Sequence, residues 1–282
     1  MSDHGDRHLP FVKMHGAGND FIMVDQRDVA IAVPGGVLGR DRIAALCDRR
    51  KGIGADGLIV IGPGTASGPA TGTAFRMAYF NADGGEAEMC GNGARCSVAF
   101  AHGLGLAPDS CLFDTWSGEL WGCVHGPGDV EISLPGWRGL DLAVGLADTP
   151  WALQAACNTG VPHLVIPVDD VDDVDIGLWG PRLRRHERFG HAGTNVNWVA
   201  PGAADGEWRI RTYERGVEAE TLACGTGASA SAVILCALGR ARSPVALRTR
   251  GGDLLTVAVD ARNTALRLRG PAVTAFEGHT RI

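Results

Sequence analysis

Short apolar runs separated by glycine-rich turns fill most of the chain, a pattern that is typical of proteins built mainly from strands. In the first half it predicts a strand, a glycine turn and a second strand over residues 11–25, and buried strands over 58–61 and 74–80. Apolar residues at helical spacing predict helices over 39–50 and 94–104.

The second half repeats this order of elements. Its predicted strands cover residues 120–124, 130–134, 163–168, 195–199, 208–214, 246–248, 254–259 and 266–268. Helices are expected over 179–185 and 225–238. Strands mixed with a few helices, in duplicated order, predict an α+β fold of two pseudo-symmetric lobes. We place the first lobe at 1–133, with a last strand in 271–282 returning to it, and the second at 134–270.

A short phrase occurs twice. It reads CGNGAR from Cys90 and CGTGAS from Cys224, 134 residues later (224 − 90), and each copy follows a polar segment holding an acid, Glu88 or Glu220. Each copy also runs into a stretch that we expect to be helical. A thiol at a helix N-terminus has its anion stabilised, and the pKa of such cysteines falls from about 8.5 toward ~3.5–7.5. The following glycines let backbone amides approach a carboxylate.

This duplication suggests two halves that face one site. Two thiols on opposite sides of a substrate suit the removal of a proton from one face of a carbon and the delivery of another to the opposite face. An amino acid fits such a site, because its carboxylate sits beside the acidic Cα–H.

Composition narrows the function classes. The 282 residues carry a net charge of −6 and are 45% hydrophobic, which argues against a nucleic-acid or anionic-membrane partner. No apolar run reaches the roughly 20 residues of a membrane span, so we expect a cytoplasmic protein whose eight cysteines are free thiols. Six of these are interpreted as buried small hydrophobic residues: Cys47, Cys96, Cys111, Cys123, Cys157 and Cys236.

Two kinds of cofactor are disfavoured. Lysine occurs only as Lys13 and Lys51, and neither is placed like the Schiff-base lysine that a pyridoxal enzyme needs. The chain also lacks the Cys-x-x-Cys pairs typical of structural zinc sites, so we expect no metal.

Eight motifs in order give the sequence a resemblance to the diaminopimelate epimerases, cofactor-independent enzymes of bacterial lysine and peptidoglycan-precursor synthesis. They are HGAGNDF at 15–21, GIGADG at 52–57, FNADG at 80–84, CGNGARC at 90–96, GVPH at 160–163, NVN at 195–197, ERG at 214–216 and CGTG at 224–227. The resemblance covers nearly everything from residue 11 onward. It implies that each lobe is a curved or barrel-like mixed sheet wrapped around a central helix.

The resemblance also implies roles for particular residues. Cys90 and Cys224 match the family's acid–base pair, one a thiolate base and the other a thiol acid. Residues matching the two anion-cradling turns are Gly91, Asn92, Gly225 and Thr226. Those matching amides that fix the distal end of the substrate are Asn19, Asn81 and Asn195. Glu214 and Arg215 match a pair that contacts amino and carboxyl groups, and His163 and Glu214 match groups that support catalysis. The family uses no cofactor, and a homodimer is usual in it.

Two departures leave alternatives open. Many relatives carry an asparagine where this chain has Val161, and some carry a glutamine at Gly57, so two amide side chains that would contact substrate are missing. A cofactor-independent racemase of a histidine- or proline-like amino acid therefore remains an alternative. A redox protein whose two cysteines cycle as a disulfide is a more remote one.

Overall fold

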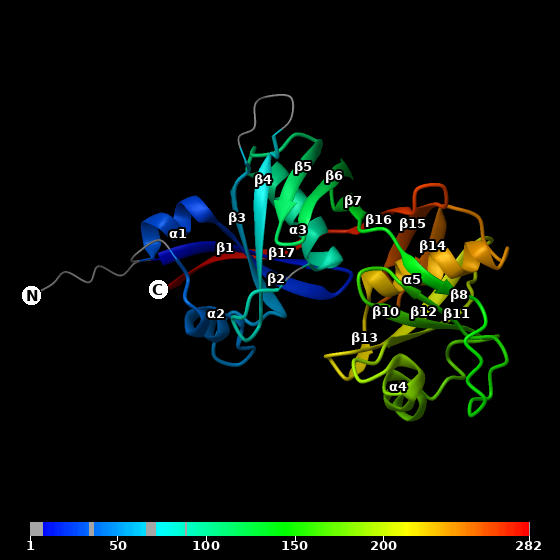
Figure 1. Cartoon of the computed structure of the whole chain (residues 1–282). Helices are drawn as coiled ribbons and strands as arrows, with labels where there is room; N and C mark the ends of the chain where they lie inside the picture. Colours follow the sequence, from blue (N-terminus) through cyan, green and yellow to red (C-terminus); the bar gives the residue numbers. More distant parts are fainter. Residues whose placement is uncertain (1–7, 34–36, 66–71, 88, 282) are drawn as a thin grey trace, which may run out of the picture. The chain divides into compact units, whose positions relative to one another are not determined.

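The computed structural model of the chain describes residues 8–33, 37–65, 72–87 and 89–281 (Figure 1). The chain divides into two compact units. The first lies within Met1–Ile132 and Pro271–Ile282, and the second is Ser133–Gly270. Glu88, the acid before the first cysteine phrase, lies outside the described residues.

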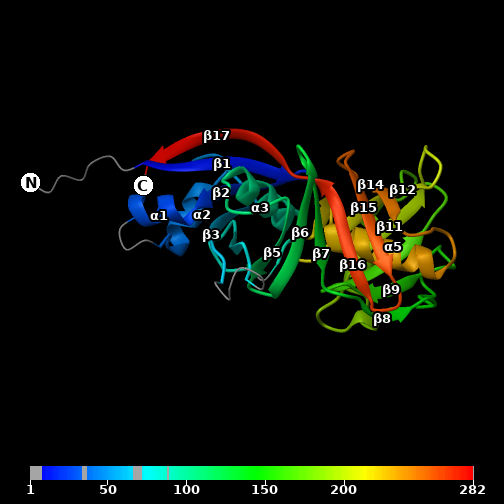
Figure 2. The ribbon, with the colours of Figure 1, turned by 90° about the horizontal axis from the view of Figure 1, so that it is seen from above.

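The first unit is a mixed sheet. Its strands are β1 (His8–Gly16), β2 (Asn19–Asp25), β3 (Gly57–Pro63), β4 (Phe75–Asn81), β5 (Ser110–Thr115), β6 (Gly118–Gly126), β7 (Asp129–Leu134) and β17 (Val273–Arg281). They pair in the order β17-β1-β2-β3-β4-β5-β6-β7, and only the β2–β3 and β4–β5 pairs are parallel. The long strand β17 runs beside β1, although the two come from opposite ends of the chain (Figure 2).

The second unit has the strands β8 (Arg138–Asp141), β9 (Ala155–Asn158), β10 (Pro162–Pro167), β11 (Asn195–Pro201), β12 (Glu207–Glu214), β13 (Ala219–Thr221), β14 (Val245–Arg248), β15 (Leu254–Asp260) and β16 (Ala265–Pro271). They pair in the order β8-β9-β10-β11-β12-β14-β15-β16, and the parallel pairs are β10–β11 and β12–β14. The short strand β13 pairs with the end of β12.

The two units share one topology. Both sheets follow the same succession of antiparallel and parallel pairs, and in both a helix connects the two strands of the second parallel pair. That helix is α3 (Gly91–Gly103) in the first unit and α5 (Gly225–Ala237) in the second, and each contacts several strands of its own sheet. The α+β class and the duplicated order predicted from the sequence are therefore confirmed in the described residues.

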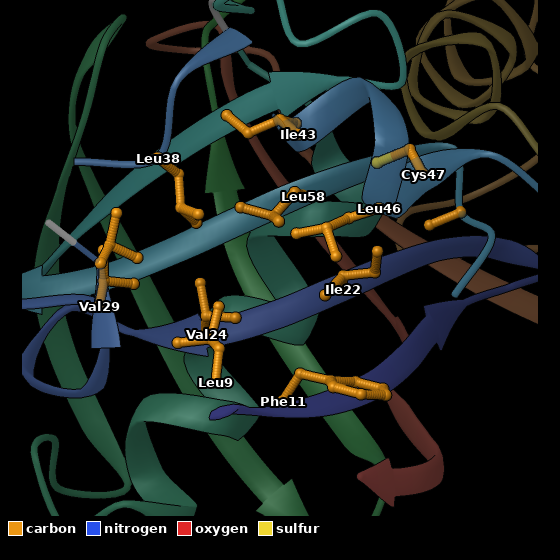
Figure 3. Close-up of a cluster of buried hydrophobic side chains, with 12 residues drawn as sticks. Leu9, Phe11, Ile22, Val24, Val29, Leu38, Ile43, Leu46, Cys47 and Leu58 are labelled. Atoms are coloured by element: carbon orange, nitrogen blue, oxygen red, sulfur yellow. The ribbon is translucent and has the colours of Figure 1, made fainter. Parts of the chain in front are cut away.

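In the first unit, a hydrophobic core that includes no residue of α3 fills the space between the sheet and the helices α1 (Gln26–Ala32) and α2 (Arg40–Cys47). Ile43, Leu46 and Cys47 of α2 lie over Ile22 and Leu58 of the neighbouring strands (Figure 3). In the second unit, α4 (Ile176–Arg184) contributes Ile176 and Leu183 to a comparable core that includes the fully buried Trp198. The short 3₁₀ helix Glu187–Phe189 follows α4.

Several element predictions were inaccurate. The helix predicted over 39–50 ends at Cys47, because the chain turns at Asp48, whose side chain accepts hydrogen bonds from the backbone of the next residues. The helix predicted from residue 94 begins at Gly91. The sequence reading also missed α1, which Asp25 caps by accepting from the backbone N–H of Arg27, and the short strands β5, β8, β9 and β13.

No helix in the described part of the chain combines the length and the hydropathy that crossing a membrane requires.

Candidate active site

The two cysteines of the repeated phrase occupy the same structural position. Cys90 is the N-cap residue of α3 and Cys224 is the N-cap residue of α5, both with extended backbone (φ −137°, ψ 118° and φ −127°, ψ 110°). Each helix has 13 residues and ends on a leucine cap. Both sulfurs therefore sit where the free backbone N–H groups of a helix give a partial positive charge.

Two amide side chains, Asn19 and Asn92, lie together beside Cys90. The thiol donates to Asn19 Oδ1 at 3.3 Å, and Asn92 Nδ2 donates to the same oxygen at 3.4 Å. Asn19 reaches this position because it begins β2 immediately after a two-residue hairpin turn, in which Ala17 and Gly18 both have positive φ (55° and 87°). This is the backbone geometry of tight hairpins with the native strand twist.

A buried arginine fixes the side chain of Asn92. Arg95 is fully buried, and its guanidinium donates to Asn92 Oδ1 at 2.9 Å, to Gly91 O at 3.4 Å and to Pro271 O at 3.2 Å. These bonds fix the first turn of α3 against Pro271, the last residue of β16. The Asn92 amide is consequently oriented with its oxygen on Arg95 and its NH₂ group toward Asn19.

Around Cys224, hydroxyl groups take the place of amides. Cys224 Sγ lies 3.5 Å from Thr226 Oγ1, and Thr159 Oγ1 donates to the backbone oxygen of Thr226 at 2.9 Å. The next glycine is sterically required: a Cβ on Gly227 would lie 2.3 Å from Asn197 Oδ1. The first turn of α5 is therefore packed directly against the Asn197 side chain of β11.

His163 is buried in the same unit, with 1% of its surface exposed. Burial, together with the charge of Arg215, lowers its pKa from 6.5 to about 3, so the imidazole is neutral. Its Nδ1 lies 3.2 Å from Asn197 Nδ2, and its Nε2 is buried without a hydrogen-bond partner among the described residues. A buried polar atom of this kind is unusual, and it marks a position where a ligand group can bind.

Asn195 and Arg215 are linked through the backbone. Asn195 Oδ1 accepts from the backbone N–H of Arg215 at 2.7 Å, while its Nδ2 donates to Pro162 O at 3.3 Å. The side chain of Asn195 thus ties the end of β12, where Glu214 and Arg215 are half-buried, to β10. The acid before the second cysteine phrase, Glu220, forms a bidentate ion pair with Arg211.

Two further positions named in the sequence analysis lie at the ends of neighbouring strands: Gly57 begins β3 and Asn81 ends β4. Asn81 ends β4 as an exposed residue, and its Oδ1 accepts from Tyr79 Oη at 3.2 Å rather than joining the bonds around Cys90. Gly57 has no room for a larger residue in this chain, because a Cβ there would lie 2.4 Å from Phe80 O.

The remaining cysteines are separate from these groups. Burial raises the pKa of Cys47, Cys111 and Cys157 to about 11 and that of Cys96 to about 12, so all four are inert thiols. The prediction of burial is confirmed for these four and was wrong for Cys123 and Cys236, which are only partly buried. None of the eight cysteines, all of which lie in the described residues, forms a disulfide.

Neither a metal nor a pyridoxal group is favoured by the residues present. In the described part of the chain, no three His, Cys, Asp or Glu side chains are grouped as metal ligands. Lys13 is buried, donates to Gly54 O, and forms an ion pair with Asp20 at 2.8 Å. These contacts give Lys13 a structural role.

Sequence reasoning missed two residues that shape the site, Asn197 and Thr159. A signal existed for Asn197: it lies two residues after Asn195, and alternate residues of a strand share a face of the sheet. Thr159 has no such signal, because it lies in a turn and reaches Thr226 across 67 positions of sequence.

Comparisons with known proteins identify the family of the chain. The family model described as diaminopimelate epimerase matches residues 11–132 and 155–275. The diaminopimelate epimerase of Aquifex aeolicus is 38% identical over 276 residues, covering 96% of this chain and 97% of that protein. The diaminopimelate epimerase of Gemmatimonas aurantiaca is 41% identical over 232 residues, covering 82% and 80%.

Solved structures of low sequence identity share the fold. A phenazine biosynthesis protein of the PhzF family from Bacillus anthracis superposes with a TM-score of 0.71 at 13% identity, over 98% of this chain and 100% of that one. A hydroxyproline epimerase from Agrobacterium vitis gives a TM-score of 0.63 at 16% identity, over 98% and 93%. By the match of its sequence along nearly its whole length, the chain belongs to the diaminopimelate epimerase family.

Proposed function

We propose that this protein is an isomerase that converts LL-diaminopimelate to meso-diaminopimelate without a cofactor, using Cys90 and Cys224 as its two acid–base groups. The observation that carries the proposal is their equivalence: both cap matched helices of topologically matched units. The substrate assignment rests on relatives of 36–41% identity that bear this name.

The reaction needs one sulfur as thiolate on one face of the substrate Cα and the other as thiol on the opposite face. The thiolate removes the Cα proton while the thiol delivers its own proton from the other side, so the configuration inverts. The roles of the sulfurs are exchanged for the reverse direction. After each turnover the protons must redistribute before the enzyme can accept the same isomer again.

Removing so weakly acidic a proton requires stabilisation of the developing charge. The free N–H groups at the starts of α3 and α5, including those of Gly91, Asn92, Gly225 and Thr226, are suited to hold the carboxylate beside Cα. The buried Nε2 of His163 offers a further donor, whose proton is not lost at neutral pH because the ring is neutral.

The rest of the substrate would be held by the remaining polar positions. The guanidinium of Arg215 offers a planar fork for the distal carboxylate, and Glu214 a partner for an ammonium group. Asn19, Asn81 and Asn195 supply amides. Of these, Asn81 is the most available, since it is exposed, whereas the Asn195 amide bonds to backbone on both sides.

The proposal also covers the cellular location and the oligomeric state of the enzyme. We propose that the enzyme is cytoplasmic, in support of which none of the eight cysteines forms a disulfide, as expected for a reducing compartment. We also propose a homodimer, for which the exposed apolar side chains of Val273 and Phe276 on β17 offer surface. Sedimentation equilibrium at micromolar concentration tests this, and a species of 29.5 kDa alone would contradict it.

The activity is tested by incubating the purified enzyme in D₂O, without added cofactor, with LL-diaminopimelate, L-histidine, L-proline or trans-4-hydroxy-L-proline. We expect deuterium at Cα and a second stereoisomer with diaminopimelate alone. Faster exchange with proline or histidine would replace the proposed substrate and keep the two-cysteine chemistry. No exchange with any amino acid in reducing buffer would refute both.

A further inference from the structure

An ionic cluster contacts the side chain of Asn19 through Asp56, and the mechanism above gives this cluster no role. It consists of Lys13, Asp20, Arg49 and Asp56. The two acids and the two bases balance in charge. They come from the strand–turn–strand unit β1–β2 and from the segment that leads into β3, and these segments hold two of the eight motifs of the family resemblance.

The cluster is internally cross-linked. The backbone N–H of Asp56 donates to Asp20 Oδ1 at 3.0 Å, and the backbone N–H of Asp20 donates to Asp56 Oδ2 at 3.2 Å. Arg49 Nη2 bridges the two carboxylates, 2.7 Å from Asp20 Oδ1 and 2.7 Å from Asp56 Oδ1. The Asp56 carboxylate therefore has a fixed position and orientation.

Asp20 anchors this arrangement. Although burial opposes its ionisation, the hydrogen bonds from Arg49 and Lys13 hold the pKa of Asp20 well below its usual range. Asp20 is thus a carboxylate at neutral pH and holds Asp56 in place through the hydrogen bonds between them.

The consequence for Asn19 follows from donor and acceptor chemistry. Asn19 Nδ2 lies 2.6 Å from Asp56 Oδ2. An ionised carboxylate only accepts hydrogen bonds, so the NH₂ end of the amide has to face Asp56. The oxygen end then has to face the other way, where it accepts from Cys90 Sγ at 3.3 Å and from Asn92 Nδ2 at 3.4 Å.

We propose that Asp56 is a positioning residue, which acts through Asn19 to present an oxygen acceptor to Cys90 and so favours the protonated thiol at that cysteine. The Thr226 hydroxyl beside Cys224 imposes no such restriction, because a hydroxyl group can either donate or accept a hydrogen bond. The resting enzyme is then asymmetric: Cys90 is poised as the acid that gives up a proton, and Cys224 as the thiolate base. This proposal rests on the acid–base function proposed for the two cysteines.

The test measures the alkylation of Cys90 by iodoacetamide as a function of pH, which reports the thiolate fraction without requiring turnover. Cleavage after arginine releases residues 77–95, a peptide in which Cys90 is the sole cysteine, so mass spectrometry follows this site alone. In Asp56→Asn the amide of Asn19 is free to turn its NH₂ group toward the sulfur. We expect the midpoint of the alkylation profile to fall by about one pH unit and kcat to fall about tenfold.

The Asp56→Asn chain is expected to fold, because the ion pair that it removes is at the surface, with 44% of the Asp56 side chain exposed. Asp148→Asn is the matched control. Asp148 is 46% exposed and also pairs with an arginine at 2.7 Å, Arg182, but it does not contact Asn19. We expect its alkylation midpoint and its kcat to equal those of the wild type.

A double-mutant cycle separates positioning from the bare charge of Asp56. If Asp56 acts through Asn19, Asn19→Ser lowers the midpoint by itself, and adding Asp56→Asn to it changes the midpoint no further. Additive shifts in the double variant, or a wild-type midpoint in Asn19→Ser, would overturn the proposal. A wild-type midpoint in Asn19→Ser would overturn the proposal even if Asp56→Asn does not fold. A wild-type enzyme without Cα exchange would instead refute the proposed function and leave these shifts interpretable.

Discussion

The side-chain amide of Asn197 fixes the tautomer of His163. Asn197 Oδ1 accepts from Thr212 Oγ1 at 2.9 Å, and Asn197 Nδ2 donates to Leu164 O at 3.0 Å, so the NH₂ group faces His163 Nδ1 at 3.2 Å. Nδ1 is therefore the acceptor, and Nε2 carries the hydrogen of the neutral ring. A buried N–H donor is thus held ready close to the first turn of α5, against which Asn197 packs.

The neutral, buried state of His163 makes stability depend on pH. Its pKa is lowered by burial to about 3 in the folded protein, against 6.5 when unfolded. Below pH 6.5 the unfolded chain takes up a proton that the folded chain refuses, so stability falls as pH falls toward 3. Between pH 7 and pH 4 we expect the wild type to lose about 3 kcal/mol more than His163→Gln.

Urea unfolding of both proteins at pH 7, 5.5 and 4 measures this difference, because the carboxylates contribute equally to each. A parallel loss of stability in the wild type and in His163→Gln would mean that His163 titrates normally in the folded state.

Gly227 is expected to tolerate no side chain. A methyl group there would meet Asn197 Oδ1 at 2.3 Å and would displace the amide that orients His163. We expect Gly227→Ala to lower the free energy of unfolding by about 1–3 kcal/mol and to reduce kcat. Thermal and urea unfolding, with steady-state assays, provide the measurement.

Gly103→Ala serves as the control for this change. Gly103 ends α3, and a Cβ built there meets no atom within 4 Å. We expect a neutral effect or a gain of about 0.4–1 kcal/mol, since alanine restricts the unfolded chain. Equal losses in the two variants would show that the contact with Asn197 does not determine the effect.

The Thr226 hydroxyl is expected to contribute to catalysis through Cys224. It lies 3.5 Å from the sulfur and, unlike the Asn19 oxygen, it can donate to a thiolate. We expect Thr226→Val to lower kcat/KM about tenfold and Thr226→Ser to retain activity near the wild-type level. If Thr226→Ser were impaired as strongly as Thr226→Val, the methyl group and its packing would be responsible, rather than the hydroxyl.

Much of the fold and the central feature of the site could be predicted from sequence. The repeated phrase at Cys90 and Cys224 could be recognised because its signals are local in sequence: a polar residue, two glycines and an apolar helical stretch predict a helix N-terminus at each cysteine. The predicted helix start at residue 94 was wrong because glycine and asparagine have low helix propensity, whereas here Arg95 binds Gly91 and Asn92 and holds them in the first turn.

The polar contacts around the site were beyond sequence reasoning for a different reason. Asp56 meets Asn19 across 37 positions, and Thr159 meets Thr226 across 67. No periodicity connects such residues, because strand pairing and turn geometry bring them together. A buried atom such as His163 Nε2 can likewise be recognised only once every neighbouring donor and acceptor is placed.

The central claim is that two sulfurs act on opposite faces of one carbon. It is tested most directly by the isotope content of the first product that forms from unlabelled LL-diaminopimelate in D₂O, below about 5% conversion. With two bases, the proton removed stays on one sulfur while deuterium arrives from the other. The account predicts meso product that carries deuterium at the inverted Cα, beside recovered substrate that keeps its hydrogen. Product that retains the substrate hydrogen, or substrate that exchanges as fast as product appears, would contradict it.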